Sequence, residues 1–310
     1  MKVKYSIVIP AYNSEHTIGN LVHKLSEVFI KESYEIIIIN DNSKDNTIEV
    51  CKELVKQNPQ VVFLNLSRNF GQHNAIIAGF NYAKGEYVIT MDDDLQNPPE
   101  EIFKLVHKIE EGYDVVYAKY PSKKHSYARN LGSKINDIMA KLMIKKPEDI
   151  YFTSFRIIRK YVVDEIIKYK GPYCYIDGLI LRVTTNLSSV EVTHLERKVG
   201  KSNYNFIRLI KLWMNGFTSF SVLPLRVATF SGFIMSFIGF ISIIVFIIQK
   251  FTNHVKMGWT SLMVCVIFFS GIQLISVGLL GEYMGRTFLS INNTPQYIVK
   301  EAVFNKDDNE

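Results

Sequence analysis

The chain has 310 residues, of which 47% are hydrophobic, so it is long enough for one large domain with an accessory region. Its formal net charge of +6 fits a protein that works against an anionic membrane face. Nucleic acid is the competing partner, but the sequence has no basic-aromatic recognition motif, so none is expected. The three cysteines are far apart and lack metal-site spacing, which suits a reducing compartment.

The N-terminal two thirds of the chain alternates strand and helix patterns. Apolar runs at residues 3–10, 34–39, 61–66 and 88–91 predict buried strands, and a helix pattern follows each of them. Four strand-then-helix units in succession predict an α/β fold with a doubly wound, mostly parallel sheet. Further strands are expected at 114–118 and 190–195. The loops gather at one sheet edge, which then carries Tyr12, Asp41 and Arg68 together with the aspartates after the fourth strand.

Three consecutive carboxylates, Asp92, Asp93 and Asp94, follow the fourth predicted strand. Alternate residues of an extended chain point the same way, so Asp92 and Asp94 can converge on one hard cation while Asp93 faces elsewhere. Gln96 follows at the same spacing as a neutral oxygen ligand. A magnesium-like ion held in this way completes its shell with substrate phosphates, which predicts a diphosphate site. The alternative is an acidic surface turn before a helix that opens at Pro98 and Pro99.

Two long apolar segments lie in the C-terminal third. Residues 227–249 and 258–281 contain no formal charge, and both exceed the roughly 20 residues needed to cross a bilayer. A buried core helix is the alternative for each, but two in succession with a short loop predict a two-helix transmembrane hairpin. Before them, apolar residues recur at helical spacing beside Arg208 and Lys211, which predicts an interfacial helix, again with a core helix as the alternative.

Four ordered motifs carry a resemblance to a known family. They are Pro10 to Asn13, Asn40 to Thr47, Arg68 to His73 and Asp92 to Pro99. The series resembles glycosyltransferase family 2, and in particular its polyprenyl-phosphate branch, the dolichol-phosphate mannose synthases and their bacterial relatives. The resemblance covers residues 4 to 205 and implies a GT-A type fold, a nucleotide-sugar donor and a divalent metal, Mg²⁺ or Mn²⁺.

The resemblance also implies roles for individual residues at the donor site. Asp92, Asp94 and Gln96 would hold the metal and diphosphate, and Asp41 would contact the nucleobase. The nucleotide would be walled by Pro10, Ala11, Tyr12, Asn13 and Glu15. Arg68, Asp93, Arg197 and Lys201 complete the expected donor-binding set. The chain departs from the family where Asn40 and Asp41 replace paired acidic residues, and where Ser14 and Glu15 replace a double glutamate.

A basic stretch follows the strand at 114–118. Arg129 and Ser133 are four apart on a predicted helix, so they share one face and can grip an anion. In the family, matching positions bind the acceptor lipid phosphate, and Lys119 is a third candidate. The loop from Glu196 to Tyr204 is similar to the family's Arg-x-x-Gly-x-Ser loop, which we interpret as a mobile gate with Arg197 offsetting charge on the leaving diphosphate.

The predicted protein is therefore a membrane-anchored enzyme that transfers one sugar from a nucleotide-sugar to a polyprenyl phosphate, undecaprenyl or dolichyl. Asp94, Arg129 and Arg197 are the predicted catalytic residues, and Asp149 and Asp177 are the best candidates for a general base. The alternatives are a processive polysaccharide synthase and a non-catalytic membrane partner that retains the fold. Donor, lipid acceptor and membrane are the expected partners, and a homo-oligomer is compatible with the sequence.

The predicted parts are a GT-A catalytic domain at 1–205, an interfacial helix region at 206–226, a two-span hairpin at 227–282 and a cytoplasmic tail at 283–310. The N-terminus leads directly into a strand, and its apolar run is too short for a cleavable signal. We therefore expect a multi-pass protein of the cell membrane with two spans, whose catalytic domain stays in the cytoplasm.

Overall fold

A computed structural model describes residues 3–120, 150–171, 174–195, 223–252, 258–292 and 294–305. The chain forms two compact units. The first contains residues 1–204 and 293–310, and the second contains residues 205–292.

The first unit is built on a mixed sheet. Within the described residues the sheet has eight strands in the order β7-β5-β6-β4-β1-β2-β3-β8. Parallel pairs join β1 to β2 and β4, β2 to β3, and β5 to β7. Antiparallel pairs join β6 to β4 and β5, and β8 to β3. The strands are β1 (Tyr5–Ala11), β2 (Tyr34–Asn40), β3 (Val61–Leu66), β4 (Tyr87–Thr90), β5 (Val115–Lys119), β6 (Arg156–Arg159), β7 (Leu187–Glu191) and β8 (Val299–Val303).

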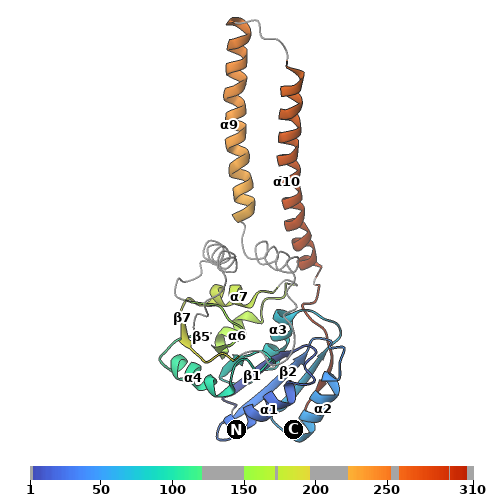
Figure 1. Cartoon of the computed structure of the whole chain (residues 1–310), viewed down its shortest axis with the longest axis vertical. Helices are drawn as coiled ribbons and strands as arrows, with labels where there is room; N and C mark the ends of the chain where they lie inside the picture. Colours follow the sequence, from blue (N-terminus) through green and yellow to red (C-terminus); the bar gives the residue numbers. More distant parts are fainter. Residues whose placement is uncertain are drawn as a thin grey trace. The chain divides into compact units, whose positions relative to one another are not determined.

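Helices cover both faces of this sheet (Figure 1). Successive side chains of a strand point to opposite faces, and because the strands are apolar at almost every position, both faces must be covered. On one face lie α1 (Ile18–Val28), α2 (Thr47–Gln57) and α4 (Ile102–Glu110), the last preceded by the short helix η1 (Pro99–Glu101). On the other lie α3 (Gln72–Tyr82), α6 (Lys160–Ile166) and α7 (Ile176–Val183). Ile7 and Ile9 of β1 pack in the core with α1, whereas Val8 between them faces Gly79 of α3.

Helix α3 lies very close to the sheet at Gly79. A Cβ atom there would be 2.5 Å from Cγ1 of Val8 and 2.7 Å from Cδ1 of Ile39. Only a residue without a side chain fits at this distance. This close packing holds the C-terminal half of α3 against β1 and β2.

The four predicted strand-then-helix units are confirmed as β1-α1, β2-α2, β3-α3 and β4-α4. Two strands were missed. Strand β6 runs antiparallel between β4 and β5, and β8 adds to β3 from a segment that the sequence analysis assigned to the tail at 283–310. Both are only four or five residues long, which is too short for a clear period-2 signal. The strand expected at 190–195 lies earlier, at 187–191.

The second unit contains two long helices, α9 (Leu223–Thr252) and α10 (Trp259–Ile291), which pack against each other. They contain the two predicted membrane segments at 227–249 and 258–281, except that Gly258 precedes α10. Many of their large apolar side chains are exposed, among them Phe230, Phe233, Leu274 and Ile275. In the part of the chain that the structure describes, no helix has the length and apolar character of a membrane span. The predicted transmembrane hairpin is therefore not confirmed. Residues 206–222 of the predicted interfacial helix lie outside the described residues.

Candidate active site

The carboxyl ends of the parallel strands β1, β2, β3 and β4 meet at one edge of the sheet. The loops that follow these strands are joined by side-chain hydrogen bonds that cross from one loop to another. In an open α/β sheet, ligands bind outside this edge. The edge therefore brings together the residues that the sequence placed there, and the bonds between them show how each is held.

Asp93 braces the loop after β1. Its Oδ2 atom accepts hydrogen bonds from the Ser14 hydroxyl and from the backbone amide of Tyr12, the latter at 3.3 Å. Burial raises the pKa of Asp93 to about 6. The expectation that Asp93 faces away from its two neighbours agrees with these contacts. Its carboxylate binds protein groups of the loop after β1, and its place in the donor-binding set stays a prediction.

Asp92 and Asp94 flank Asp93 in the sequence. Oδ1 of Asp92 accepts a hydrogen bond from Nε2 of Gln72 at 2.7 Å, and Oδ2 accepts one from the Ser154 hydroxyl. Burial raises the pKa of Asp92. Oδ1 of Asp94 accepts the backbone amide of Gln96 at 3.1 Å across a turn in which Leu95 has a φ of 60°. This left-handed residue makes the turn tight enough for Asp94 and Gln96 to share a short loop.

Gln96 is tied to the segment after β7. Its Nε2 donates to the carbonyl of Leu195 at 3.2 Å, and its own carbonyl accepts the Leu195 amide at 2.8 Å. Its side-chain oxygen is the atom expected to bind a metal. Within the described residues, no group of three or more His, Cys, Asp and Glu side chains is arranged around a common point for a metal ion. The candidate set of two carboxylates and one amide matches the sites in which substrate phosphates supply the remaining ligands.

Asp41 is 4% exposed, and its carboxylate holds the loop after β3. Oδ1 accepts the amide of Phe70 at 2.7 Å and Oδ2 accepts the amide of Gly71 at 2.9 Å. Burial raises the pKa of Asp41, with the two backbone hydrogen bonds acting in the opposite direction. Contact with a nucleobase stays a prediction. Arg68, in the same loop, is exposed and its guanidinium lies 4.7 Å from the centre of the Phe70 ring.

The structure explains why an amide can stand at Asn40. Its Nδ2 donates to Oδ1 of Asn65 at 2.8 Å, while its Oδ1 accepts the amide and hydroxyl of Ser43. Ser43 in turn accepts the amide of Asn13 at 2.9 Å. An amide side chain both donates and accepts, whereas a carboxylate only accepts. Asn65 on β3 is thus the partner that makes asparagine suitable at the end of β2.

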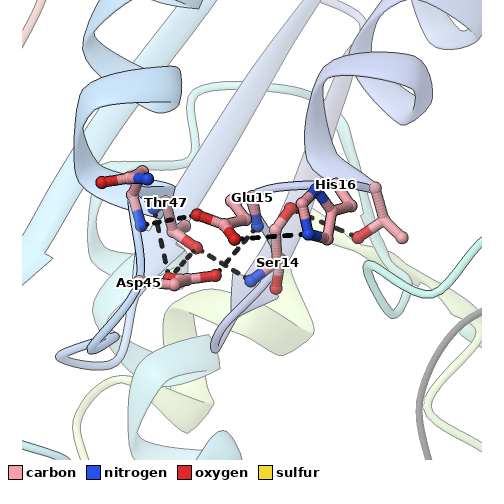
Figure 2. Close-up of polar contacts among 7 residues, drawn as sticks. Ser14, Glu15, His16, Asp45 and Thr47 are labelled. Atoms are coloured by element: carbon pink, nitrogen blue, oxygen red, sulfur yellow. Dashed lines mark hydrogen bonds and ion pairs between the residues drawn. The ribbon is translucent and has the colours of Figure 1, made fainter.

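Glu15 points toward the start of α2 (Figure 2). Its Oε2 accepts the amide of Asn46 at 2.9 Å, and Oε1 lies 3.3 Å from Nε2 of His16. The Glu15 amide donates to Asp45, whose other oxygen accepts the hydroxyl of Thr47 at 2.6 Å. These bonds fasten the loop after β1 to helix α2. The structure therefore gives Glu15 a bracing role, and its predicted contact with nucleotide remains untested.

The remaining predicted residues fall into two groups. Pro10 and Ala11 form the end of β1, Tyr12 is 43% exposed beyond it, and Lys119 is exposed at the end of β5. The second group lies outside the described residues: Arg129, Ser133, Asp149, Arg197 and Lys201.

Asp177 is unsuited to act as a general base. It is 7% exposed, forms an ion pair with Arg156, which is 2% exposed, and accepts a hydrogen bond from the Tyr117 hydroxyl at 3.0 Å. These two buried partners occupy its carboxylate. This pairing was not predicted, because Arg156 is on strand β6, which the sequence pattern did not predict.

Comparison with known proteins identifies the family. Residues 6–167 match the model of glycosyl transferase family 2. The chain is 37% identical over 307 residues to an uncharacterized glycosyltransferase, YkcC, of Bacillus subtilis (strain 168), covering 97% of this chain and 94% of that protein. It is 33% identical over 306 residues to the undecaprenyl-phosphate 4-deoxy-4-formamido-L-arabinose transferase of Proteus mirabilis (strain HI4320), with the same coverage. The chain belongs to glycosyltransferase family 2, and its resemblance to the polyprenyl-phosphate branch is confirmed.

Solved structures give a weaker likeness. Mannosyl-3-phosphoglycerate synthase from Rubrobacter xylanophilus is 13% identical with a TM-score of 0.49, covering 69% of this chain and 71% of that chain. A glucosyl-3-phosphoglycerate synthase from Mycobacterium tuberculosis is 17% identical with a TM-score of 0.47, covering 67% and 75%. The mixed α/β sheet with its candidate site at the carboxyl edge agrees, on its own topology, with the GT-A type fold that the motifs implied.

Proposed function

We propose that this family 2 glycosyltransferase transfers one sugar from a nucleotide-sugar to a polyprenyl phosphate, undecaprenyl phosphate in a bacterium. The observation that carries the proposal is the similarity to the Proteus mirabilis undecaprenyl-phosphate sugar transferase. It extends over 97% of this chain and therefore includes the long helices as well as the sheet. Similarity limited to the domain that binds the donor would not indicate which acceptor the enzyme uses.

A divalent ion, Mg²⁺ or Mn²⁺, would be held by Asp92, Asp94 and Gln96. Two carboxylates and an amide oxygen beside a loop edge suit a hard cation that also binds phosphate oxygens. When bound, such an ion neutralises the negative charge that develops on a diphosphate leaving group. The protein's own part is to hold these oxygens in place, through Gln72 and Ser154 for Asp92 and through the left-handed turn at Leu95 for Asp94.

The acceptor's chemistry makes a general base unnecessary. The second pKa of a phosphate monoester is about 6, so the attacking oxygen is already largely anionic at neutral pH. A hydroxyl acceptor would instead need a nearby carboxylate. The ion pair of Asp177 supports this proposal, because it removes one of the two carboxylates suggested for that role. Cationic groups are then needed to bring the lipid phosphate and the donor diphosphate together. We assign Arg129 and Lys119, with the Ser133 hydroxyl, to the lipid phosphate. We assign Arg197 and Lys201 to the donor.

The lipid acceptor implies work at a membrane surface, with the sheet unit on the cytoplasmic side where nucleotide-sugars occur. The exposed apolar side chains of α9 and α10 support contact with lipid. Sedimentation with membranes at neutral pH tests this point. The protein is expected to sediment with the membranes and to be released by detergent.

The activity test uses the purified full chain, a panel of radiolabelled nucleotide-sugars and undecaprenyl phosphate in detergent. One donor is expected to give label that passes into the organic phase and needs divalent metal. Asp94→Asn serves as the matched inactive variant, since it removes a charged ligand while keeping the side-chain size. The proposal is wrong if no donor labels the lipid above the level of Asp94→Asn, or if the label enters a polymer.

A further inference from the structure

Ser154 lies beside Asp92 because of the register of two antiparallel strands. In the β4-β6 pair, Val88 lies opposite Ile158 and Thr90 lies opposite Arg156. Each step of two residues along β4 is matched by a step of two back along β6, so the same register brings Asp92 opposite Ser154. The Ser154 hydroxyl donates to Oδ2 of Asp92 across this pair.

The second oxygen of Asp92 is held from the opposite direction. Gln72, in the first turn of α3, donates from Nε2 to Oδ1 at 2.7 Å. One donor on each oxygen fixes the rotation of the carboxylate about its Cβ–Cγ bond. Each oxygen of a carboxylate has two lone pairs, so each keeps one for a metal. Asp92 is therefore oriented before any ligand arrives.

Ser154 is itself held by a buried network. Its carbonyl accepts the hydroxyl of Thr90 at 2.5 Å, and Nε of Arg156 donates to that hydroxyl oxygen at 3.2 Å. Arg156 is in turn fixed by the buried ion pair with Asp177. Breaking a buried ion pair would leave an uncompensated charge in the core, so the side chain of Arg156 is held in one conformation. The network thus runs without a break from beneath the sheet to the Ser154 that bonds Asp92.

We propose that Ser154 is a positioning residue that orients Asp92 for the metal and diphosphate of the donor. This inference rests on the proposed function for the identity of that ligand. Hydrogen bonds to metal-binding carboxylates commonly change metal affinity by roughly 10-fold to 100-fold when removed. Ser154 acts through Asp92, and a purely structural hydroxyl at this position would affect stability but not metal binding.

The experiment measures binding in the absence of turnover. The purified full chain is titrated with Mn²⁺ in the presence of uridine or guanosine diphosphate, and free Mn²⁺ is read by electron paramagnetic resonance. Ser154→Ala is expected to weaken Mn²⁺ binding by roughly tenfold or more, while Ser154→Thr, which keeps a hydroxyl, restores it. Ser26→Ala is the matched control, because the Ser26 hydroxyl bonds only a helix carbonyl in α1. Thermal melting of each variant shows that it is folded at the temperature of the titration.

The inference is overturned if Ser154→Ala binds Mn²⁺ as the wild type does, or if Ser154→Thr is as weak as Ser154→Ala. Failure of the proposed function is separate and visible in the wild type alone. In that case the unaltered chain binds Mn²⁺ with a nucleoside diphosphate but labels no lipid, and the comparison of Ser154 variants still decides the role of the hydroxyl.

Discussion

The Ser14 hydroxyl donates a hydrogen bond to Oδ2 of Asp93, although the two residues are 79 positions apart in the chain. This bond joins the loop after β1 to the loop after β4. The Ser14 amide also donates to Thr47 at 2.8 Å, which adds the start of α2 to the same arrangement. Two loops at the candidate donor site and the start of α2 are thus held by one serine.

Ser14→Ala is expected to weaken donor binding more than it weakens the fold. The variant loses two hydrogen bonds of the hydroxyl, one donated to the Asp93 carboxylate and one accepted from the Tyr12 amide. A typical bond is worth about 1 kcal/mol net, and one to a charged group roughly 1.5 to 3 kcal/mol. The loops stay attached through the Ser14 amide, so the free energy of unfolding should fall by no more than these bonds are worth, whereas the apparent KM for the nucleotide-sugar rises. Steady-state kinetics and chemical denaturation measure the two effects. A variant with unchanged KM but a large loss of stability would show that the bond serves the fold alone.

Arg129→Ala is expected to raise the apparent KM for the lipid acceptor. If Arg129 seats the lipid phosphate, the lost contact is worth roughly 1.5 to 3 kcal/mol, or about tenfold to a hundredfold. Lys123→Ala, a nearby basic residue with no assigned role, should behave as the wild type. Asp149→Asn should lower the rate less than Arg129→Ala, because a phosphate acceptor needs no base. An inactive but folded Asp149→Asn together with a normal Arg129→Ala would reverse the assignment.

We expect the protein to lose stability at acid pH because of His73. The residue is half-buried with its Nδ1 atom fully buried, it lies near Asp177 and Arg156 with the Tyr175 ring 5.4 Å away, and burial lowers its pKa from 6.5 to about 4. Between the two pKa values, His73 is protonated in the unfolded chain but neutral in the folded chain. Stability is therefore complete above pH 6.5 and falls as the pH drops toward 4, by on the order of 3 kcal/mol for this group.

Urea denaturation between pH 7 and 4 tests this effect in the wild type, His73→Phe and His23→Asn. His73→Phe keeps a ring but cannot be protonated, so its stability should depend less steeply on pH than that of the wild type. His23 is exposed on α1, and its replacement should leave the dependence unchanged. Parallel curves for wild type and His73→Phe would contradict the prediction.

Gly79→Ala is expected to destabilise the first unit by about 1 to 3 kcal/mol, because the added Cβ would press on Val8 and Ile39 in a packed core. Gly19 in α1 provides the matched control, since nothing lies within 4 Å of the Cβ that it would gain. Gly19→Ala should stabilise by roughly 0.5 to 1 kcal/mol through helix propensity. Denaturation midpoints of the two variants should therefore move in opposite directions, and equal shifts would refute the packing argument.

The sequence predicted those parts of the site that depend on local pattern. Strand ends, the β-α succession and the divergence of Asp93 from Asp92 and Asp94 follow from alternation along one strand, which is visible in a short stretch of chain. Contacts made by pairing between distant strands were not predicted. Ser154 reaches Asp92, and Arg156 neutralises Asp177, only because β6 runs antiparallel to β4. The contact of Glu15 with the Asn46 amide was not predicted for a similar reason, since Asn46 belongs to another β-α unit.

Strand β8 has a consequence for how the protein is made. It pairs with β3 at Phe63, Leu64 and Asn65, and the carbonyl of Ile298 accepts the amide of Ser67. On the ribosome, β3 emerges more than 200 residues before β8, given the positions of the two strands. During that interval β3 is an open edge that exposes unpaired backbone groups and can recruit other chains. Completion of the sheet therefore waits for β8 to be translated, and a chain that stops after α10 would leave this edge permanently uncovered.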